Sequence, residues 1–331
     1  MQKSLRGSKI TGTGRYAPKR VITNFDLEKM VDTTDEWIFT RSGIRERRIA
    51  APDEATSDVV LPAARAALEA AGLDPGELDG IIVGTVSGDM MFPATACLVQ
   101  DRLGAAKAAA FDISAACCGF IYGVNIAHSL IASGQMNKVL VVGAEVLSKI
   151  LDWSDRATCV LFGDGAGAAV LEPAEPGSGI LGTYIRTDGA LADLLHLPAG
   201  GTRQPASHET IEARGHYIKM KGDGVFKYAV RAMEDAARQV LDDAGLALED
   251  VDILIPHQAN IRIIDAVQER LGVPADRVIV NLDRYGNTSS ASIPIALDEA
   301  ARNGKMKKGD LVLLVAFGGG LTWGSVLFRY I

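Results

Sequence analysis

Cysteine is scarce in this chain: four are present among 331 residues. None belongs to a C-x-x-C pair, and no cysteine–histidine spacing is typical of a zinc site. These absences argue against a disulfide-stapled scaffold and against a structural metal. We therefore expect reduced thiols, no bound metal and a cytoplasmic location.

Long apolar runs and an excess of positive charge are absent as well. The longest runs, Ile81–Val86 and Val139–Ala144, have the length of buried strands, well short of the ~18 residues that a membrane span needs. The segment Met1–Ile10 is polar and basic without an apolar centre, so we expect no secretory signal. The net charge of −7 argues against nucleic-acid binding, which needs a basic surface for phosphate.

An internal repeat organises the chain. Five segments of the first half recur in the same order in the second half, at a shift of about 155–175 residues, on the order of one domain length. The pairs are 65–73 with 238–246, 8–13 with 178–183, 102–104 with 270–272, 133–136 with 303–306, and 162–170 with 317–326. Amphipathic helices alternate with continuous apolar strands, which predicts mostly parallel sheets covered by helices. We expect two similarly folded units, 1–173 and 174–331, divided near the turn-rich stretch 172–179.

Cys117 lies at a predicted turn between an apolar strand, 108–113, and an apolar helix, 120–131. A thiol at a helix N-terminus faces free backbone N–H groups and the positive end of the helix dipole, which favour the thiolate. Cys117 is therefore a candidate nucleophile, although small buried fillers at Cys117 and Cys118 would give the same pattern. The repeat pairs Cys117 with Asn287, so the two turns could face each other across one shared site.

Three further segments could supply chemistry to that site. His257 follows an apolar strand and can exchange protons near neutral pH, whereas Asn287 offers a fixed N–H donor. A hydrogen-bonded loop histidine and a turn-forming asparagine are the alternatives. Phe317–Gly320 leaves backbone N–H groups unobstructed, as an oxyanion hole requires, and also suits a tight hairpin. The glycines of 162–167 run directly into a strand and so do not fit a dinucleotide-binding turn.

The residues around these positions resemble a known family. Ala115–Phe120, Pro256–Asn260, Gly286–Ser289 and Phe317–Gly320 together are similar to the condensing enzymes of the thiolase superfamily, most closely β-ketoacyl-acyl-carrier-protein synthase III. Further matching segments are 32–38, 40–48, 162–170 and 322–324, so the resemblance covers nearly the whole chain. It implies an α/β thiolase-like fold, in which two pseudo-repeated βα halves pack as α-β-α-β-α layers.

The resemblance also implies a reaction. An acyl-CoA primer, acetyl or another short acyl, is joined to malonyl-acyl carrier protein, giving 3-oxoacyl-acyl carrier protein, CoA and CO₂ and starting type II fatty acid synthesis. Cys117 would take the acyl group, while His257 and Asn287 would donate hydrogen bonds to the malonyl thioester. The backbone N–H groups of Cys117 and Gly319 would form an oxyanion hole. No cofactor is implied. A condensing enzyme of specialised metabolism, or an inactive scaffold of the same fold, stays open.

Binding residues follow from the same resemblance. Trp37 and Arg156 would sandwich the CoA adenine, and Phe92 would enter the acyl pocket of a neighbouring subunit, which implies a homodimer. The positions implied along the CoA path are Thr33, Trp37, Arg41, Arg156, Gly222, Phe226, Ala229, Asn260 and Arg262. The acidic carrier protein would dock on Gln258, Arg262, Lys227 and Arg270, with Lys219 and Lys221 nearby. Three residues depart from the familiar pattern: Cys118 adds a second thiol, Asp223 would alter a CoA contact, and Glu269 would weaken docking.

Overall fold

The computed structural model describes residues 6–331. Met1–Leu5, the first part of the segment in which no secretory signal is predicted, lie outside the described residues, as does the side chain of Asp223. None of the described helices combines the length and the apolar character needed to cross a bilayer.

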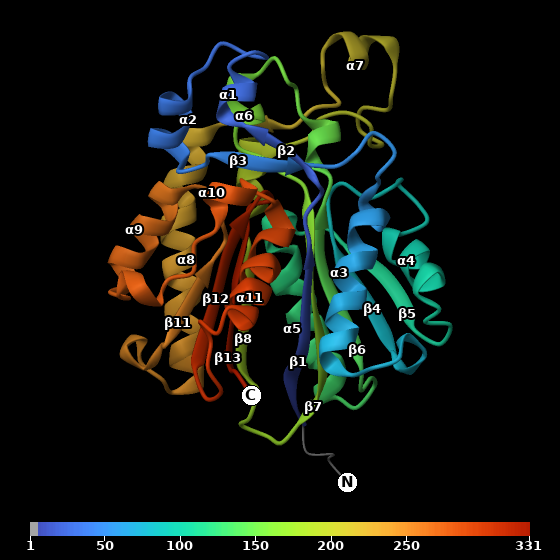
Figure 1. Ribbon diagram of the computed structural model, residues 1–331, viewed down its shortest axis with the longest axis vertical. Coiled ribbons are helices and arrows are strands. Elements are labelled where there is room, and N and C mark those ends of the chain that lie inside the picture. Colours follow the sequence, from blue (N-terminus) through green and yellow to red (C-terminus); the bar gives the residue numbers. More distant parts are fainter. Residues whose placement is uncertain (1–5) are drawn as a thin grey trace.

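Two large sheets form the framework (Figure 1). The first sheet has the order β1 (Gly7–Tyr16), β7 (Gly165–Ala174), β6 (Val139–Glu145), β4 (Gly80–Gly84), β5 (Ala109–Ile113). The second has the order β11 (Ile253–Pro256), β12 (Leu311–Gly318), β13 (Thr322–Arg329), β8 (Ile180–Thr187). Taken from β8, the second sheet repeats the order of the first, and a single parallel bridge from Leu254 to Val278 stands where β5 would follow. The position of the boundary at 173/174 stays a prediction.

Helices cover both sheets and fill the space between them. The long helices are α3 (Thr56–Ala71), α4 (Thr95–Leu103), α5 (Gly119–Ala132), α8 (Gly222–Ala244), α9 (Ile261–Leu271) and α11 (Ser292–Arg302). In Figure 1, α3 and α4 lie on the outside of the first sheet, α8 and α9 on the outside of the second, and α5 and α11 lie between the sheets. One apolar core contains residues of α5, α11 and strands of both sheets. The predicted α-β-α-β-α layering is confirmed.

Shorter elements surround this framework. The small helices are α1 (Asn24–Leu27), α2 (Asp35–Ser42), α6 (Arg156–Cys159), α7 (His208–Glu212) and α10 (Leu282–Tyr285), and the short strands are β2 (Arg20–Thr23), β3 (Glu46–Ile49), β9 (Leu195–His196) and β10 (Lys219–Met220). The 3₁₀ turns are η1 (Pro75–Glu77), η2 (Ala116–Cys118), η3 (Leu147–Ile150), η4 (Gly189–Leu194), η5 (Leu248–Asp250), η6 (Ala275–Arg277) and η7 (Ser289–Ala291).

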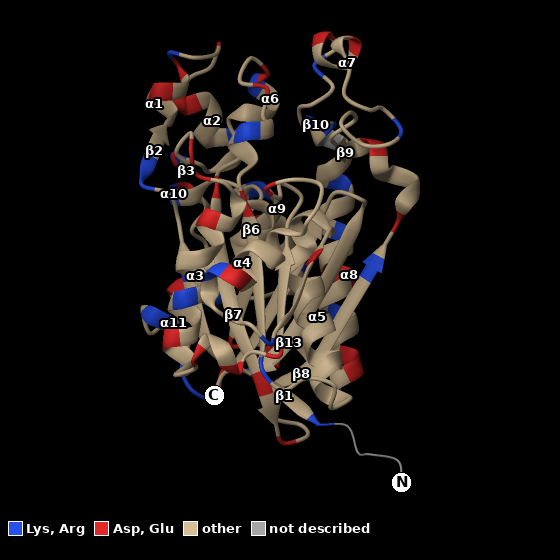
Figure 2. Cartoon of the chain, turned by 90° about the vertical axis from the view of Figure 1, so that its right-hand side faces the viewer, with Lys and Arg blue, Asp and Glu red and all other residues tan. Residues whose placement is uncertain are grey.

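The central strands are apolar on both faces. Every residue of β4, β6 and β12 is buried, as strands covered by helices on each side require. Figure 2 shows the consequence: charged residues lie mainly on the outer elements, and the strands through the middle are almost free of them.

The two central helices begin in matching turns. η2 leads into α5 as η7 leads into α11, and the first residue of each turn has a positive φ: +45° at Ala116 and +49° at Ser289. Cys117 therefore corresponds to Ser290, and its predicted pairing with Asn287 is wrong by three residues. The repeat shift of about 170 residues is too coarse to define the register of these turns, where the shift from Ala116 to Ser289 is 173 residues. The turns pack closely, because a Cβ on Gly119 would lie 2.6 Å from the Ser290 hydroxyl.

Candidate active site

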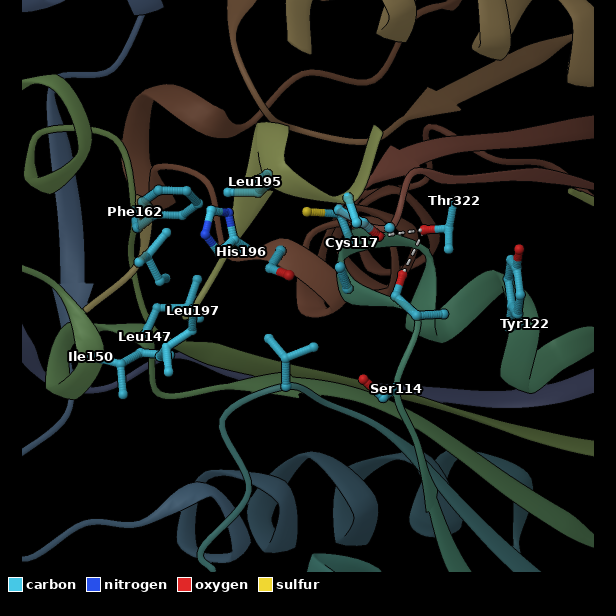
Figure 3. Close-up of a pocket in the computed structure, with 18 of the residues that line it drawn as sticks. Ser114, Cys117, Tyr122, Leu147, Ile150, Phe162, Leu195, His196, Leu197 and Thr322 are labelled. Carbon is cyan, nitrogen blue, oxygen red and sulfur yellow. Dashed lines mark hydrogen bonds between the residues drawn. The ribbon is translucent and has the colours of Figure 1, made fainter. Parts of the chain in front are cut away.

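A cavity of about 490 Å³ lies between the two halves. Its walls are mostly apolar, and both halves contribute to them. The lining residues are Val86, Ser114–Cys117, Tyr122, Leu147, Ile150 and Phe162 from the first half, and Thr187, Ala192, Leu195–Leu197, Ile218, Ser289, Gly319, Gly320 and Thr322 from the second. Figure 3 shows the sulfur of Cys117 pointing into this space toward Leu195 and His196.

Cys117 is a buried thiol, 6 % exposed, in the turn that opens α5. Burial, reinforced by the negative charge of Glu145, raises its pKa to about 12, and the neighbouring Ser289 hydroxyl opposes this only in part. Burial therefore opposes the thiolate that the helix N-terminus is predicted to favour. Loss of hydration stabilises the neutral thiol relative to the thiolate.

Cys118 occupies the core beneath this turn. It is fully buried and does not line the cavity, and its thiol donates a hydrogen bond to the carbonyl of Thr322, 3.4 Å away. The Thr322 hydroxyl in turn donates to the carbonyl of Ala115 at 2.9 Å. Cys118 thus fastens the nucleophile turn to the second half, and of the two adjacent thiols only Cys117 reaches the cavity.

His257 follows β11 and is neutral. Burial lowers its pKa to about 3. Its Nδ1 lies 2.6 Å from the hydroxyl of Ser292, which also accepts the backbone N–H of Gln258 at 3.4 Å. Because the Ser292 proton has no other acceptor among its described partners, Nδ1 accepts it and the ring proton resides on Nε2. The histidine therefore offers an N–H donor.

Asn287 precedes η7, and its amide orientation is fixed by one contact. The backbone N–H of Ser289 donates to Oδ1 at 2.8 Å, which leaves the Nδ2 protons free. Asn287 and His257 lie outside the cavity wall itself, but both are tied to the segment that lines it: Asn287 through Ser289, and His257 through Ser292 at the start of α11. The segment 287–292, which contains η7 and the first residue of α11, thus lies beside all three candidate catalytic residues.

Gly318 ends β12, and Gly319 lies in the turn that leads into β13. Phe317–Gly320 therefore forms the tight hairpin that its sequence also suits. A Cβ on Gly318 would lie 2.6 Å from the backbone nitrogen of Cys117, and Gly319 lines the cavity. The hairpin therefore contacts the nucleophile turn, and the oxyanion hole formed by the backbone N–H groups of Cys117 and Gly319 stays a prediction.

Replacing Gly318 with alanine is expected to lower the rate at which Cys117 reacts by about 10²-fold, because its Cβ would displace the Cys117 backbone. Gly201→Ala is the matched control, since a Cβ there would meet nothing within 4 Å and the backbone has no positive φ. Steady-state rates of both purified variants provide the measurement. Similar activity in the two variants would contradict the tight contact.

Comparison with known proteins identifies the family. Residues 111–189 match a model described as 3-oxoacyl-[acyl-carrier-protein] synthase III, and residues 241–330 match its C-terminal counterpart. The β-ketoacyl-[acyl-carrier-protein] synthase III of Caldanaerobacter subterraneus subsp. tengcongensis is 59 % identical over 97 % of each chain. The chain belongs to the β-ketoacyl-[acyl-carrier-protein] synthase III family. It is thus an acyltransferase of the condensing type that acts in the initiation of fatty acid synthesis.

Solved structures agree with this family assignment. The crystal structure of 3-oxoacyl-[acyl-carrier-protein] synthase III from Aquifex aeolicus VF5 has a TM-score of 0.90 at 55 % identity, covering 98 % of this chain and 100 % of that one. The priming β-ketosynthase of the R1128 polyketide pathway has the same TM-score at 39 % identity, covering 98 % and 97 %. The synthase III fold is therefore shared with an enzyme of specialised metabolism, but the curated relatives at 52–59 % identity favour fatty acid initiation.

The structure brings several residues predicted to bind CoA in this synthase III family member into one cluster. The guanidinium groups of Arg41 and Arg156 lie 4.6 and 5.3 Å from the centre of the Trp37 ring. Asn260 caps α9 and donates from Nδ2 to the carbonyl of Arg41 at 2.9 Å. The Thr33 hydroxyl in the neighbouring loop is buried without a hydrogen-bond partner.

A second group of predicted CoA contacts lies at α8 and α9. Arg262 is 5.8 Å from the centre of the Phe226 ring, and Gly222 begins α8 at an exposed position. Ala229 differs from these neighbours, because it is buried in the apolar core beneath α8. Contact of CoA with Arg262 and Phe226, and with the cluster around Trp37, stays a prediction.

The carrier-protein prediction needs one correction. Gln258 is 1 % exposed, and its amide donates to the carbonyls of Pro256 and Ile279 and accepts from the N–H of Asn281. Its assignment to a docking surface is wrong, because its place after β11 puts it in the core. Of the predicted cations, Lys221, Lys227, Arg262 and Arg270 are exposed and Lys219 is half-buried. Arg270 is paired with Glu234 at 2.8 Å and lies beside the exposed Glu269.

Two residues of the site escaped the sequence analysis. Ser289 lines the cavity in contact with Cys117, and Glu145, at the end of β6, accepts its hydroxyl at 3.1 Å. Ser289 stands within a segment that the sequence analysis singled out for Asn287. The sequence gives one local indication of Glu145, which is a charged residue at the end of a continuous apolar strand. Its partner Ser289, however, lies 144 residues away.

Glu145→Gln should change how stability depends on pH. Burial raises the pKa of Glu145 from 4.5 to about 7, so the folded protein holds its proton more tightly than the unfolded chain. The stability that this tighter proton binding contributes is complete below the pKa that Glu145 has in the unfolded chain. It is lost as the pH rises through about 7. The melting temperature of the variant, relative to that of the wild type, should therefore be a few degrees higher at about pH 8 than at about pH 5. An offset independent of pH would contradict the shifted pKa.

Proposed function

We propose that this family member transfers an acyl group from acyl-CoA to Cys117 and condenses it with malonyl-acyl carrier protein, without a cofactor. The observation that carries the proposal is the junction at η7. There a cavity-facing thiol, a neutral histidine and an oriented asparagine amide are held together from both halves of the chain. An inactive scaffold would have no need of this arrangement.

In the first half-reaction, the Cys117 sulfur attacks the thioester carbonyl of the primer. The carbonyl oxygen becomes negative and accepts hydrogen bonds from the backbone N–H groups of Cys117 and Gly319, which stabilise the charge. The bond to the CoA sulfur breaks, and the proton lost by Cys117 leaves with the CoA thiol. The apolar wall formed by Leu147, Ile150, Phe162 and their neighbours suits the hydrocarbon part of the acyl group.

In the second half-reaction, the malonyl group loses CO₂ and its thioester oxygen takes up enolate charge. Nε2 of His257 and Nδ2 of Asn287 donate to that oxygen, and they bind it more strongly as the charge develops. The carbanion then attacks the acyl-Cys117 carbonyl, forming the new carbon–carbon bond and releasing the thiolate of Cys117. Neutral donors suit this step, because a carboxylate at position 287 would repel the enolate.

The experiment for this proposal follows both half-reactions. The protein is incubated with acetyl-CoA and with short branched acyl-CoAs, and the Cys117-containing peptide is analysed by mass. Malonyl-acyl carrier protein is then added. An acyl adduct on Cys117 and a 3-oxoacyl product are expected. A chain that forms neither with any primer would overturn the proposal, and a preference for an acceptor other than the carrier protein would favour specialised metabolism.

We also propose that the protein acts as a homodimer. Strand β5 lies at the edge of the first sheet with an unpaired side, and the nearby loop exposes Met90, Met91 and Phe92, the last at 84 %. Large apolar side chains exposed together are typical of an interface. Sedimentation at micromolar concentration should give twice the chain mass, and a monomer would contradict this proposal.

Phe92→Ala is expected to extend the range of primers accepted, because the ring would no longer fill the acyl pocket of the partner. The measurement is the distribution of Cys117 adducts from an equimolar mixture of acyl-CoAs, from acetyl to decanoyl. Phe25→Ala, at another exposed phenylalanine, is the control and should leave the distribution unchanged. Identical distributions in both variants would count against a role for Phe92 in the pocket.

A further inference from the structure

Glu145 is a fully buried carboxyl group, and it forms no salt bridge with any described residue. Its oxygens accept hydrogen bonds from the Thr85 hydroxyl at 3.3 Å, the backbone N–H of Val86 at 3.2 Å, the Ser87 hydroxyl at 2.5 Å and the Ser289 hydroxyl at 3.1 Å. All four donors are neutral. Burying a carboxyl group without a counterion is costly, so its retention beside the nucleophile calls for a function.

Ser289 connects this carboxyl group to the nucleophile. Its hydroxyl donates to Glu145 at 3.1 Å, and Ser289 and Cys117 line the same cavity, where their side chains interact. Because the hydroxyl proton faces Glu145, a lone pair of the same oxygen is left to accept the S–H of Cys117. The φ of +49° at Ser289 is rarely adopted by residues other than glycine, and such strain concentrates at functional positions.

The alternative proton acceptor, His257, is poorly suited to the thiol. The Ser292 hydroxyl occupies its Nδ1, and the ring proton on Nε2 removes the lone pair that a base would need. Burial also lowers the pKa of His257 to about 3, whereas it raises that of Glu145 to about 7. Both geometry and basicity therefore favour the carboxylate over the imidazole.

We propose that Ser289 and Glu145 form a proton relay that activates Cys117 for acylation. This relay rests on the proposed role of Cys117 as nucleophile. As the sulfur attacks the thioester carbonyl, its proton moves to the Ser289 oxygen and the Ser289 proton moves to the Glu145 carboxylate. When the bond to the CoA sulfur breaks, its electron pair stays on that sulfur, which takes up the proton returned through Ser289. Glu145 is again ionised, and acyl-Cys117 and CoA thiol are the products.

The test compares Ser289→Ala and Glu145→Gln with the wild type in single-turnover acylation of Cys117, followed by mass across pH 5.5 to 9. The groups facing Glu145 are Thr85, Val86, Ser87, Ser289 and Cys117, and of these Cys117 is the one that titrates in addition to Glu145. Wild-type acylation should rise with pH and level off above about 7 as the carboxylate forms. Both variants should lose this inflection and react about 10²-fold more slowly.

The controls separate a relay from a structural or a purely electrostatic role. Ser290→Ala removes a buried hydroxyl without a hydrogen-bond partner in the same turn, and it should retain both the rate and the inflection. Ser289→Ala keeps the backbone N–H that orients Asn287, so decarboxylation of malonyl-acyl carrier protein should fall far less than acylation. Glu145→Asp should recover part of the rate together with a pH inflection. Thermal unfolding verifies that each variant is folded.

Three outcomes would overturn the relay. If Glu145 acted only through its charge, which raises the pKa of Cys117, then Glu145→Gln would acylate faster than the wild type. Unchanged rates and profiles in both variants would leave the relay without a role. If Glu145→Gln does not fold, a wild-type rate and inflection in Ser289→Ala would be sufficient to reject it. A wild type that forms no adduct at all would instead reject the proposed function.

Discussion

Cys117→Ser is expected to lower acyl transfer by about 10³-fold or more, the largest effect of any single substitution in the chain. A serine hydroxyl is far less acidic than a thiol and is a weaker nucleophile toward thioesters. Burial makes this worse, because it already raises the pKa of the native thiol to about 12, and an alkoxide would be still more costly in the same place. Release of CoA and the mass of the adduct measure the loss directly.

The adjacent thiol provides the matched control for this prediction. Cys118→Ala removes the hydrogen bond to the Thr322 carbonyl but leaves Cys117 facing the cavity, so an adduct should still form. Cys97→Ser, at the exposed cysteine, should acylate at the wild-type rate. An adduct located on Cys118 in the Cys117→Ser variant would contradict the assignment of the nucleophile.

His257→Ala and Asn287→Ala are each expected to slow decarboxylation of malonyl-acyl carrier protein by about 10²–10³-fold. Each removes one N–H donor to the enolate oxygen. In His257 that donor is Nε2, because Nδ1 accepts from Ser292, and in Asn287 it is Nδ2, because Oδ1 accepts from Ser289. Asn287→Asp should lose at least as much, since its charge opposes that of the enolate.

Acylation in the same variants is the internal control. The donors act on the malonyl group, so the rate at which Cys117 takes up the primer should fall much less than CO₂ release from the malonyl group. Equal losses in the two half-reactions of His257→Ala would contradict this division of roles. The low pKa of His257, about 3, also means that its charge should not change between about pH 5 and pH 8.

Much of the site could be predicted because its chemistry is concentrated in short segments. Cys117, His257 and Gly318–Gly320 lie at the ends of apolar strands, whereas Asn287 precedes an apolar helix, and strands of a covered sheet are recognisable from their continuous hydrophobicity. The recurrence of helix, glycine and strand in the same order predicted two sheets of matching topology, and the strand orders agree. These inferences depend on contacts within a few residues, which local sequence specifies.

The errors and omissions share one origin. The pairing of Cys117 with Asn287 failed because the register of two short turns depends on their backbone geometry, and Gln258 was placed on the surface because its burial depends on partners more than 20 residues away. The raised pKa of Cys117 could not be predicted either, because the sequence shows a helix N-terminus but not the loss of water around it. Burial is a property of the assembled fold, and it governs the ionisation of every group at this site.

The sequence by itself determined the family, the layered fold and the identity of the candidate nucleophile and its two donors. Only the tertiary structure decided the ionisation state of these groups and their proton positions, because both depend on hydrogen bonds between distant segments. Ser289 shows this best: its N–H orients Asn287, and its hydroxyl donates to Glu145 beside Cys117 in the cavity wall. No pattern along the chain marks that junction, since it forms only where the two halves meet.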